Sequence, residues 1–122
     1  AHVCYSALDG EAPGTLSRTV IQEAIRGAIG FDGLLLSDDL SMEALSGTLG
    51  ERAAAALAAG CDVALHCNGR AEEMADVAAS VAELSAEAVR RWDGAKANVK
   101  KDNLSEFSVL SEEFDKLVEM FC

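Results

Sequence analysis

The sequence predicts an α/β protein in which helices alternate with the strands of a parallel sheet. Two short apolar runs, Leu34–Leu36 and Cys61–Cys67, show little polar alternation, which is typical of strands buried on both faces. Each run is followed by polar residues and then by a segment with helical spacing of its apolar side chains. The resulting order of strand, helix, strand, helix, strand, helix indicates a parallel sheet, either doubly wound or barrel-like.

The amino-terminal segment supplies the first strand and helix of this order. Ala1–Leu8 mixes Val, Cys, Tyr and Leu and is predicted to be the end of a strand. A turn at Pro13 follows. Ser17 or Thr19 can then cap a helix that runs to about Ala28, with apolar residues at helical spacing.

The middle of the chain carries three further predicted helices. A short one spans about Leu40–Leu45, and an alanine-rich one spans Glu51–Ala59 and is stopped by Gly60. Ala71 to about Trp92 is predicted to be one long amphipathic helix. The residues on its apolar side are Met74, Val77, Val81, Leu84 and Val89.

The last quarter of the chain differs in composition from the rest. Residues 1–95 are predicted to hold three βα units, residues 96–104 a polar linker, and residues 105–122 an amphipathic C-terminal helix. Phe107, Leu110 and Phe114 recur every three or four residues there, which is the spacing of a helix with one apolar face. Such a helix either docks back on its own domain, which we favour, or pairs with a partner helix.

Length and charge narrow the classes of function. Three βα units within 122 residues are too few to close an eight-stranded barrel, which needs about 250 residues. The chain is therefore a small open domain or a piece of a larger one, and its start at Ala1 rather than Met favours a piece. A net charge of −11 argues against nucleic acid and anionic membranes as partners. Four scattered cysteines predict free thiols in a reducing cytosol.

The strongest candidate for chemistry is the carboxylate pair in Ser37-Asp38-Asp39-Leu40, directly after an apolar run. Active sites of parallel α/β proteins lie at the carboxyl ends of the strands. A carboxylate at that edge can be a nucleophile, a general base or a metal ligand, or it can simply cap the next helix. Strand alternation predicts that Asp38 shares a face with Leu36 and that Asp39 points to the other face.

Two histidines fall at comparable positions. His2 lies near the end of the amino-terminal strand, and His66 lies near the end of the second apolar run, just before Asn68. Each could instead be a histidine whose hydrogen bonds are satisfied within the fold. No Cys-x-x-Cys or His-x-x-His spacing indicates a metal site, and no glycine-rich phosphate loop is present, so we expect neither metal nor cofactor.

The string Gly30–Met42, with Ser-Asp-Asp-Leu-Ser-Met at its end, closely resembles the bacterial β-N-acetylhexosaminidases of glycoside hydrolase family 3. These are cytosolic enzymes of peptidoglycan recycling. Ala1-His2-Val3 is similar to the sixth barrel strand of the family, and Ala58–Asp62 and Leu65–Asn68 are similar to its eighth strand. The tail from Phe107 to Leu117 resembles the family's carboxyl-terminal helix.

The resemblance implies a fold and a mechanism. The chain would be the carboxyl-terminal portion of a (β/α)8 TIM barrel, about the last three βα units, plus a C-terminal helix. The family removes terminal β-linked N-acetylglucosamine from muropeptides, with retention, through a covalent glycosyl-enzyme. Its nucleophile is the first aspartate of the motif, here Asp38. Asp39 and Met42 would then either line the pocket or lie just behind its wall, with Asp39 ordering the loop, and His2, His66 and Asn68 would lie near the pocket rim. The implied location is cytoplasmic.

One departure from the family pattern matters. The family's acid/base histidine, the aspartate paired with it and the sugar-binding arginines all precede the sixth strand, and none is present in this sequence. His2 and His66 match other motifs. We therefore expect this chain to need the amino-terminal part of the barrel and to hydrolyse aryl N-acetylglucosaminides very poorly alone. The alternative is a non-catalytic half-barrel that associates with another copy or a partner through its sheet edges and tail.

Overall fold

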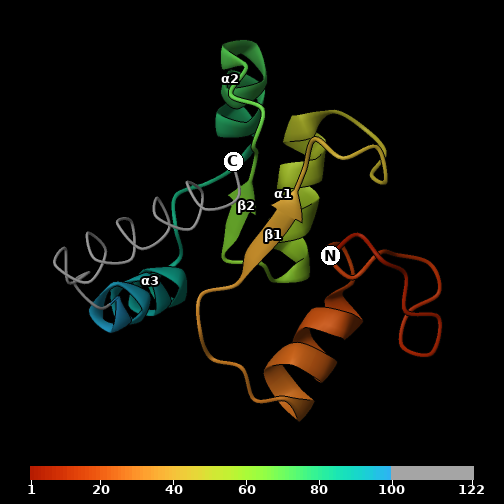
Figure 1. Cartoon of the computed structure of the whole chain (residues 1–122), viewed down its shortest axis with the longest axis vertical. Helices are drawn as coiled ribbons and strands as arrows, with labels where there is room; N and C mark the ends of the chain where they lie inside the picture. Colours follow the sequence, from red (N-terminus) through yellow and green to blue (C-terminus); the bar gives the residue numbers. More distant parts are fainter. Residues whose placement is uncertain (100–122) are drawn as a thin grey trace, which may run out of the picture.

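The computed structural model describes residues 1–99, in which helices and strands alternate (Figure 1). The elements are the π-helix η1 (Val20–Ala28), β1 (Leu36–Asp39), α1 (Leu49–Ala59), β2 (Val63–Leu65), α2 (Ala71–Ser80) and α3 (Ala86–Asn98). Strands β1 and β2 pair in parallel, as the sequence predicts, with Leu36 beside Val63 and Asp39 beside Leu65. Helix α1 connects them, so β1, α1 and β2 form a βαβ unit.

Within residues 1–99, one face of the sheet is covered by the core, and the other, here called the open face, carries the exposed side chains of Leu36, Asp38 and Leu65. The core packs α1, η1 and the loop after β1 against the covered face, and its buried members are Ile21, Leu40, Leu45, Ala53, Ala56, Ala59 and Cys61. Along β1 the exposed fraction alternates: Leu36 is 47% exposed, Ser37 is 5% exposed and Asp38 is exposed again. This confirms that Leu36 and Asp38 share a face. The expectation of strands buried on both faces is wrong, because Leu36 of β1 and Leu65 of β2 are exposed on the sheet.

Helix α1 begins and ends where its sequence dictates. Thr48 accepts a hydrogen bond from the Glu51 backbone N–H, and the Glu51 carboxylate accepts one from the Thr48 N–H, which is a complete capping box. Gly60 ends the helix with φ of 122°, a conformation that favours glycine. Small alanine side chains on its buried face let α1 approach the sheet closely.

The amino-terminal segment is not a strand, contrary to the prediction over Ala1–Leu8. The only bridge there joins Tyr5 to Asp9. The carbonyl of Val3 instead accepts a hydrogen bond from the following turn, at Gly14, so this segment pairs with its own turn rather than with β1. The predicted cap is present: Ser17 Oγ accepts a hydrogen bond from the Val20 N–H at 3.1 Å.

The loop after β1 is a series of turns rather than the predicted helix over Leu40–Leu45. The Asp39 carboxylate accepts hydrogen bonds from both the backbone N–H and the hydroxyl of Ser41. Such local side-chain bonds compete with helix formation, and six residues are too few for helical cooperativity to overcome them.

The predicted long helix Ala71–Trp92 is two helices. Helix α2 ends at Ser80, and α3 starts after Ser85, whose hydroxyl accepts a hydrogen bond from the Ala88 N–H at 3.1 Å. Most of the predicted apolar side is exposed, because Met74, Leu84 and Val89 lie outside the core. None of the helices within residues 1–99 is long and apolar enough to cross a membrane.

Helix α3 runs to Asn98, so the first residues of the predicted linker 96–104 are helical. The remainder of that linker, the predicted C-terminal helix 105–122 and Cys122 lie outside the described residues.

Candidate active site

Asp38 lies near the carboxyl end of β1, on the open face of the sheet. Its side chain is exposed, and its Oδ1 accepts a hydrogen bond from the backbone N–H of Asp39 at 2.9 Å. No ion pair within residues 1–99 includes this carboxylate. Among residues 1–99, no hydrogen-bond donor contacts the second oxygen, Oδ2. A carboxylate in this state can act as a nucleophile or a base.

Asp39 occupies a different environment although it is the next residue. Its Oδ2 accepts a hydrogen bond from the Ser41 hydroxyl at 2.6 Å, and its Oδ1 accepts from the backbone N–H groups of Ser41 and Cys67 at 3.0 and 3.2 Å. These hydrogen bonds, the Ser41 hydroxyl most of all, hold the pKa of Asp39 below its ordinary value. Asp39 is thus an ionised link between the loop after β1 and the segment after β2.

His2 lies at the same edge and contacts the backbone of β1. Its Nε2 is 2.8 Å from the carbonyl oxygen of Asp39, and because a carbonyl can only accept, Nε2 carries the proton. Its Nδ1 is 3.0 Å from the hydroxyl of Thr15. Both ring nitrogens are therefore hydrogen-bonded, and His2 links the amino-terminal segment to the end of β1.

His66 and Asn68 follow β2 but are directed toward α2. The side chain of His66 is only 6% exposed, and its Nε2 lies 3.2 Å from a carboxylate oxygen of Glu73. That contact lacks hydrogen-bond geometry, and both ring nitrogens are buried without a hydrogen bond. Asn68 donates to the same Glu73 oxygen. His66 is thus enclosed between β2 and α2, whereas Asp38 faces the open side.

Sequence reasoning did not single out two residues around the end of the sheet, Cys67 beside Asp38 and Arg52 beside the loop after β1. Cys67 is exposed, and desolvation together with the nearby carboxylates of Asp39 and Asp38 raises the pKa of its thiol. Arg52, from α1, donates to the carbonyl oxygens of Leu40 and Met42 at 2.8 and 3.1 Å. Strand alternation from Leu65 could have placed Cys67 on the open face, but no sequence signal indicated the role of Arg52.

Met42 itself lies in the turn after β1 with 45% of its surface exposed. Its backbone N–H donates to the carbonyl of Asp39 at 3.3 Å. The side chain therefore projects from the loop that the Asp39 carboxylate organises.

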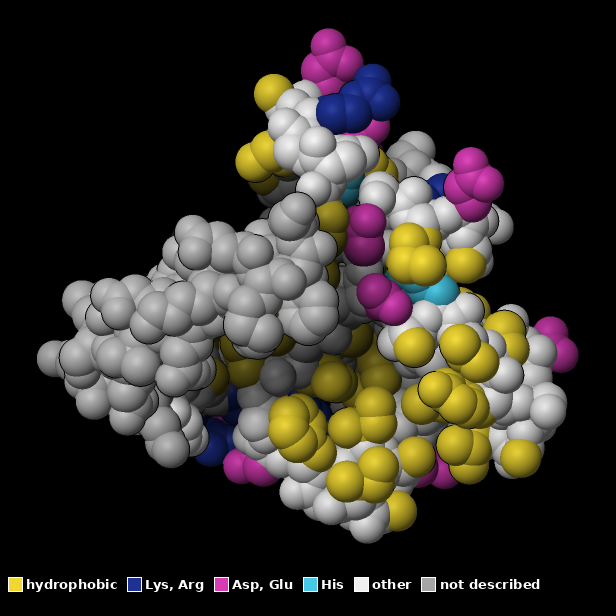
Figure 2. Space-filling view, in the orientation of Figure 1, with side chains coloured by type: hydrophobic (Ala, Val, Ile, Leu, Met, Phe, Trp, Pro, Cys, Tyr) yellow, Lys and Arg dark blue, Asp and Glu magenta, His cyan; other side chains and the backbone are white. Residues whose placement is uncertain are grey.

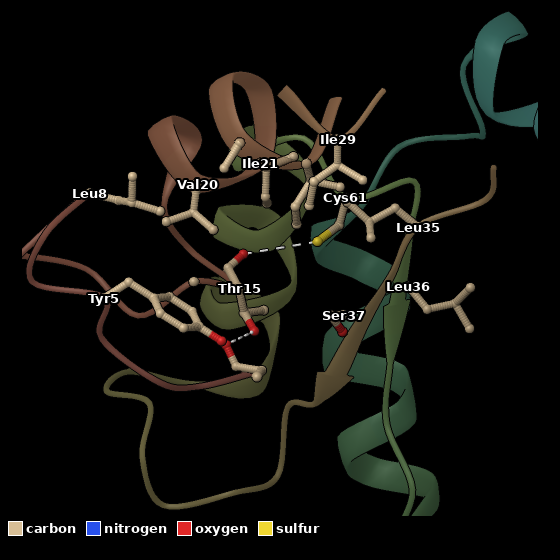
Figure 3. A pocket seen from close by; sticks show the side chains of 14 residues that line it. Tyr5, Leu8, Thr15, Val20, Ile21, Ile29, Leu35, Leu36, Ser37 and Cys61 are labelled. Atoms are coloured by element: carbon tan, nitrogen blue, oxygen red, sulfur yellow. Dashed lines mark hydrogen bonds between the residues drawn. The ribbon is translucent and has the colours of Figure 1, made fainter. Parts of the chain in front are cut away.

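An apolar cavity of about 260 Å³ lies beside β1 rather than at Asp38 (Figure 3). It is enclosed by the amino-terminal segment, η1 and the start of β1, with Leu36 and Cys61 among its lining residues. Figure 2 shows hydrophobic side chains gathered on this part of the surface. No group of three or more His, Cys, Asp and Glu side chains in residues 1–99 is arranged to hold a metal ion.

Comparison with known proteins adds two findings. Residues 1–100 match the model of the glycosyl hydrolase family 3 N terminal domain. The chain is 52% identical over 77 residues to the Beta-hexosaminidase of Tolumonas auensis, a match covering 62% of this chain and 23% of that protein.

Two further relatives carry the same name. The Beta-hexosaminidase of Bordetella avium is 49% identical over 70 residues, covering 56% of this chain and 20% of the relative. That of Pseudomonas aeruginosa is 49% identical over 73 residues, covering 58% and 22%. The matched part is thus about a fifth to a quarter of the length of each relative.

Proposed function

The chain belongs to the glycosyl hydrolase family 3 N terminal domain family, and we propose that it is the nucleophile-bearing part of a retaining β-N-acetylhexosaminidase. The single observation that carries this proposal is Asp38, an exposed carboxylate at the carboxyl end of a parallel strand that forms no ion pair with any residue of the described range 1–99. The substrate would be a muropeptide with terminal β-linked N-acetylglucosamine, cleaved during cell-wall recycling in the cytoplasm. Free thiols at Cys4, Cys61 and Cys67 accord with that reducing location.

The proposed reaction has two steps. A carboxylate oxygen of Asp38 bonds to the anomeric carbon while the glycosidic oxygen leaves with a proton from a general acid. Water then attacks the same carbon, the bond to Asp38 breaks, and the sugar leaves with its original configuration. Oδ2 is the oxygen available for attack, because Oδ1 is held by the Asp39 N–H.

Neither of the two histidines of this chain is placed to act as the general acid. His2 Nε2 is occupied by the carbonyl of Asp39. His66 is buried against Glu73 and turned away from the open face. General acid–base catalysis contributes about 10²- to 10⁴-fold to rate, so its absence predicts a very weak isolated chain.

We propose that the chain forms the carboxyl-terminal portion of a (β/α)8 barrel whose amino-terminal part covers the open face. Inward-facing side chains of a barrel pack against those of other strands. Leu36 and Leu65, on the open face, are 47% and 36% exposed, as expected of side chains that lack such partners. The apolar cavity beside β1 is a second unfilled apolar surface.

The test compares the isolated chain with a complemented protein. The complemented protein is this chain fused behind the part of the Tolumonas auensis relative that precedes the matched region. With 4-nitrophenyl N-acetyl-β-D-glucosaminide, we expect the complemented protein to turn over at least about 10²-fold faster than the isolated chain. The same fusion carrying Asp38→Asn is the matched control and should be inactive.

Two outcomes would contradict the proposal. Turnover by the isolated chain close to that of the Tolumonas auensis enzyme would show that no other part of a barrel is needed. An inactive complemented protein that folds, together with an isolated chain that forms a defined dimer in solution, would favour the non-catalytic association module. The exposed apolar face is the observation that keeps this second candidate in view.

A further inference from the structure

We propose that Ser37 and Asp39 are positioning residues that hold the peptide group after Asp38 from both ends and so fix the direction of the Asp38 carboxylate. This inference rests on the proposed role of Asp38 as nucleophile. The sequence motif identifies Asp38, but it does not explain why the residues on either side must be a serine and an aspartate. The hydrogen bonds around β1 supply that explanation.

The Ser37 side chain accepts a strand hydrogen bond at a place where the pairing of β1 and β2 is irregular. The register between β1 and β2 shifts between Leu36 and Asp39, so the strand ladder is interrupted beside Asp38. The backbone N–H of Leu65 donates to the hydroxyl of Ser37 at 2.9 Å, and that hydroxyl donates to the carbonyl of Asp38 at 2.8 Å. The side chain of Ser37 is directed toward the covered face and is buried (Figure 3). A buried hydroxyl thus replaces a backbone acceptor and holds the carbonyl of Asp38, which belongs to the peptide group between Asp38 and Asp39.

Asp39 holds the other end of this peptide group through three separate segments. Its carboxylate binds the loop after β1, through Ser41, and the segment after β2, through the Cys67 N–H. Its carbonyl accepts a hydrogen bond from His2 of the amino-terminal segment. These contacts hold Asp39 in place, and the Ser37 hydroxyl holds the carbonyl of Asp38. The peptide group between Asp38 and Asp39 is thereby fixed from both ends, and its N–H is the donor to Asp38 Oδ1.

This arrangement acts on catalysis through geometry rather than through contact with the sugar. Ser37 and the Asp39 carboxylate belong to the covered face, whereas Asp38 is exposed on the open face. A displacement of about 1 Å in a reacting group can cost on the order of 10²-fold in rate. Loss of either support therefore predicts a lower kcat with little change in KM.

The experiment uses variants of the complemented protein. Asp39→Ala removes every hydrogen bond of the carboxylate, and we expect kcat to fall by about 30- to 100-fold with KM changed by less than about threefold. Asp39→Asn is the conservative variant. Its Oδ1 can still accept from the two N–H groups and its amide can donate to the Ser41 hydroxyl, so kcat should return to within about fivefold of the parent.

Ser37→Ala tests the other support, and Glu43→Ala is the matched control. Glu43 is an exposed carboxylate in the same loop, and its removal should leave kcat and KM unchanged. We expect Ser37→Ala to lower kcat by about tenfold, again with little change in KM. Ser37→Ala removes only one hydroxyl group, whereas Asp39→Ala removes a whole carboxylate. If Asp39→Ala does not fold, the kcat of Ser37→Ala still tests the positioning role.

The outcomes separate this inference from the proposed function. If Asp38→Asn remains active, the nucleophile assignment fails whatever the neighbours do. If Asp38→Asn is inactive but Asp39→Ala and Ser37→Ala keep the parental kcat, only the positioning role fails. Equal losses for Asp39→Asn and Asp39→Ala would also overturn it, because the charge rather than the hydrogen-bond geometry would then be responsible.

Discussion

Two aspartates at opposite ends of the sheet differ in exposure and in hydrogen bonding. Asp38, at the carboxyl end of β1, is exposed and accepts one hydrogen bond, from a backbone N–H. Asp62, at the amino end of β2, has a side chain only 6% exposed. Its carboxylate accepts hydrogen bonds from Arg26 of η1, Arg91 of α3 and the backbone N–H of Leu35 at 2.7 to 2.9 Å.

The difference separates a structural carboxylate from the proposed nucleophile. Asp62 is buried and fully paired, and it joins η1, α3 and the start of β1 at a single point. A buried charge of this kind is stable only while its partners remain. Asp38 is exposed and forms no salt bridge within the described part of the chain, so a substrate can approach it without breaking one there. At the amino end of the sheet, hydrogen bonds of Asp62 hold neighbouring elements together. At the carboxyl end, the Asp38 carboxylate is exposed.

The largest expected effect is the loss of kcat on substitution of Asp38, the proposed nucleophile. Asp38→Asn or Asp38→Ala in the complemented protein should reduce kcat by about 10⁴- to 10⁶-fold, the range found when a nucleophile or its partner is removed from other covalent enzymes. The thermal unfolding midpoint should stay within about 2 °C, because an exposed side chain with one hydrogen bond contributes little to stability. Steady-state kinetics and a thermal melt check both parts. A large fall in the midpoint would place Asp38 with the structural carboxylates instead.

Substitution of Asp62, at the amino end of the sheet, should lower stability strongly and kcat only slightly. Asp62→Asn leaves Arg26 and Arg91 without their buried anion, so the free energy of unfolding should fall by about 3 kcal/mol. Urea unfolding of the chain measures this directly. In the complemented protein, molecules that still fold should keep a kcat within a few-fold of the parent. A loss of less than about 1 kcal/mol in the free energy of unfolding would mean that the ion pairs of Asp62 with Arg26 and Arg91 contribute little to stability.

The smallest effect is expected at an exposed pair beside the same cluster. Arg90 contacts Asp32 at 2.7 Å, but their side chains are 53% and 64% exposed. The hydrogen bond from Arg90 is the main reason that the pKa of Asp32 lies below its ordinary value. Surface ion pairs are worth little, so Arg90→Ala should change the free energy of unfolding by less than about 1 kcal/mol. A loss matching that of Asp62→Asn would show that exposure does not distinguish the two pairs.

The sequence predicted the features that depend on local pattern. The apolar run Cys61–Cys67 contains β2, whereas β1 begins only at Leu36, the last residue of the predicted run, and continues through the polar residues after it. Alternation placed Leu36 and Asp38 on one face, and of the two predicted caps Ser17 is the one that accepts a hydrogen bond. The sequence also identified Gly60 as the end of α1. Each of these depends on the chemistry of a few neighbouring residues, which a single sequence contains.

Features that depend on distant partners were not predicted. The segment Ala1–Leu8 has strand-like composition, but a strand requires a neighbour to accept its hydrogen bonds, and here its own turn takes that place. The long amphipathic pattern of Ala71–Trp92 gave no sign of the break before Ser85. Likewise, Asp62 could not be distinguished from Asp38 as a structural residue, because Arg26 and Arg91 reach it from 36 and 29 residues away.

The most direct test of the account is covalent capture of the nucleophile. The complemented protein would be incubated with 5-fluoro-N-acetyl-β-D-glucosaminyl fluoride, digested, and analysed by mass spectrometry for the modified peptide. We predict a single sugar adduct on Asp38, absent from Asp38→Asn and formed more slowly in Asp39→Ala. An active protein that carries the adduct on another residue, or that turns over the aryl glycoside without any adduct, would contradict the assignment of Asp38.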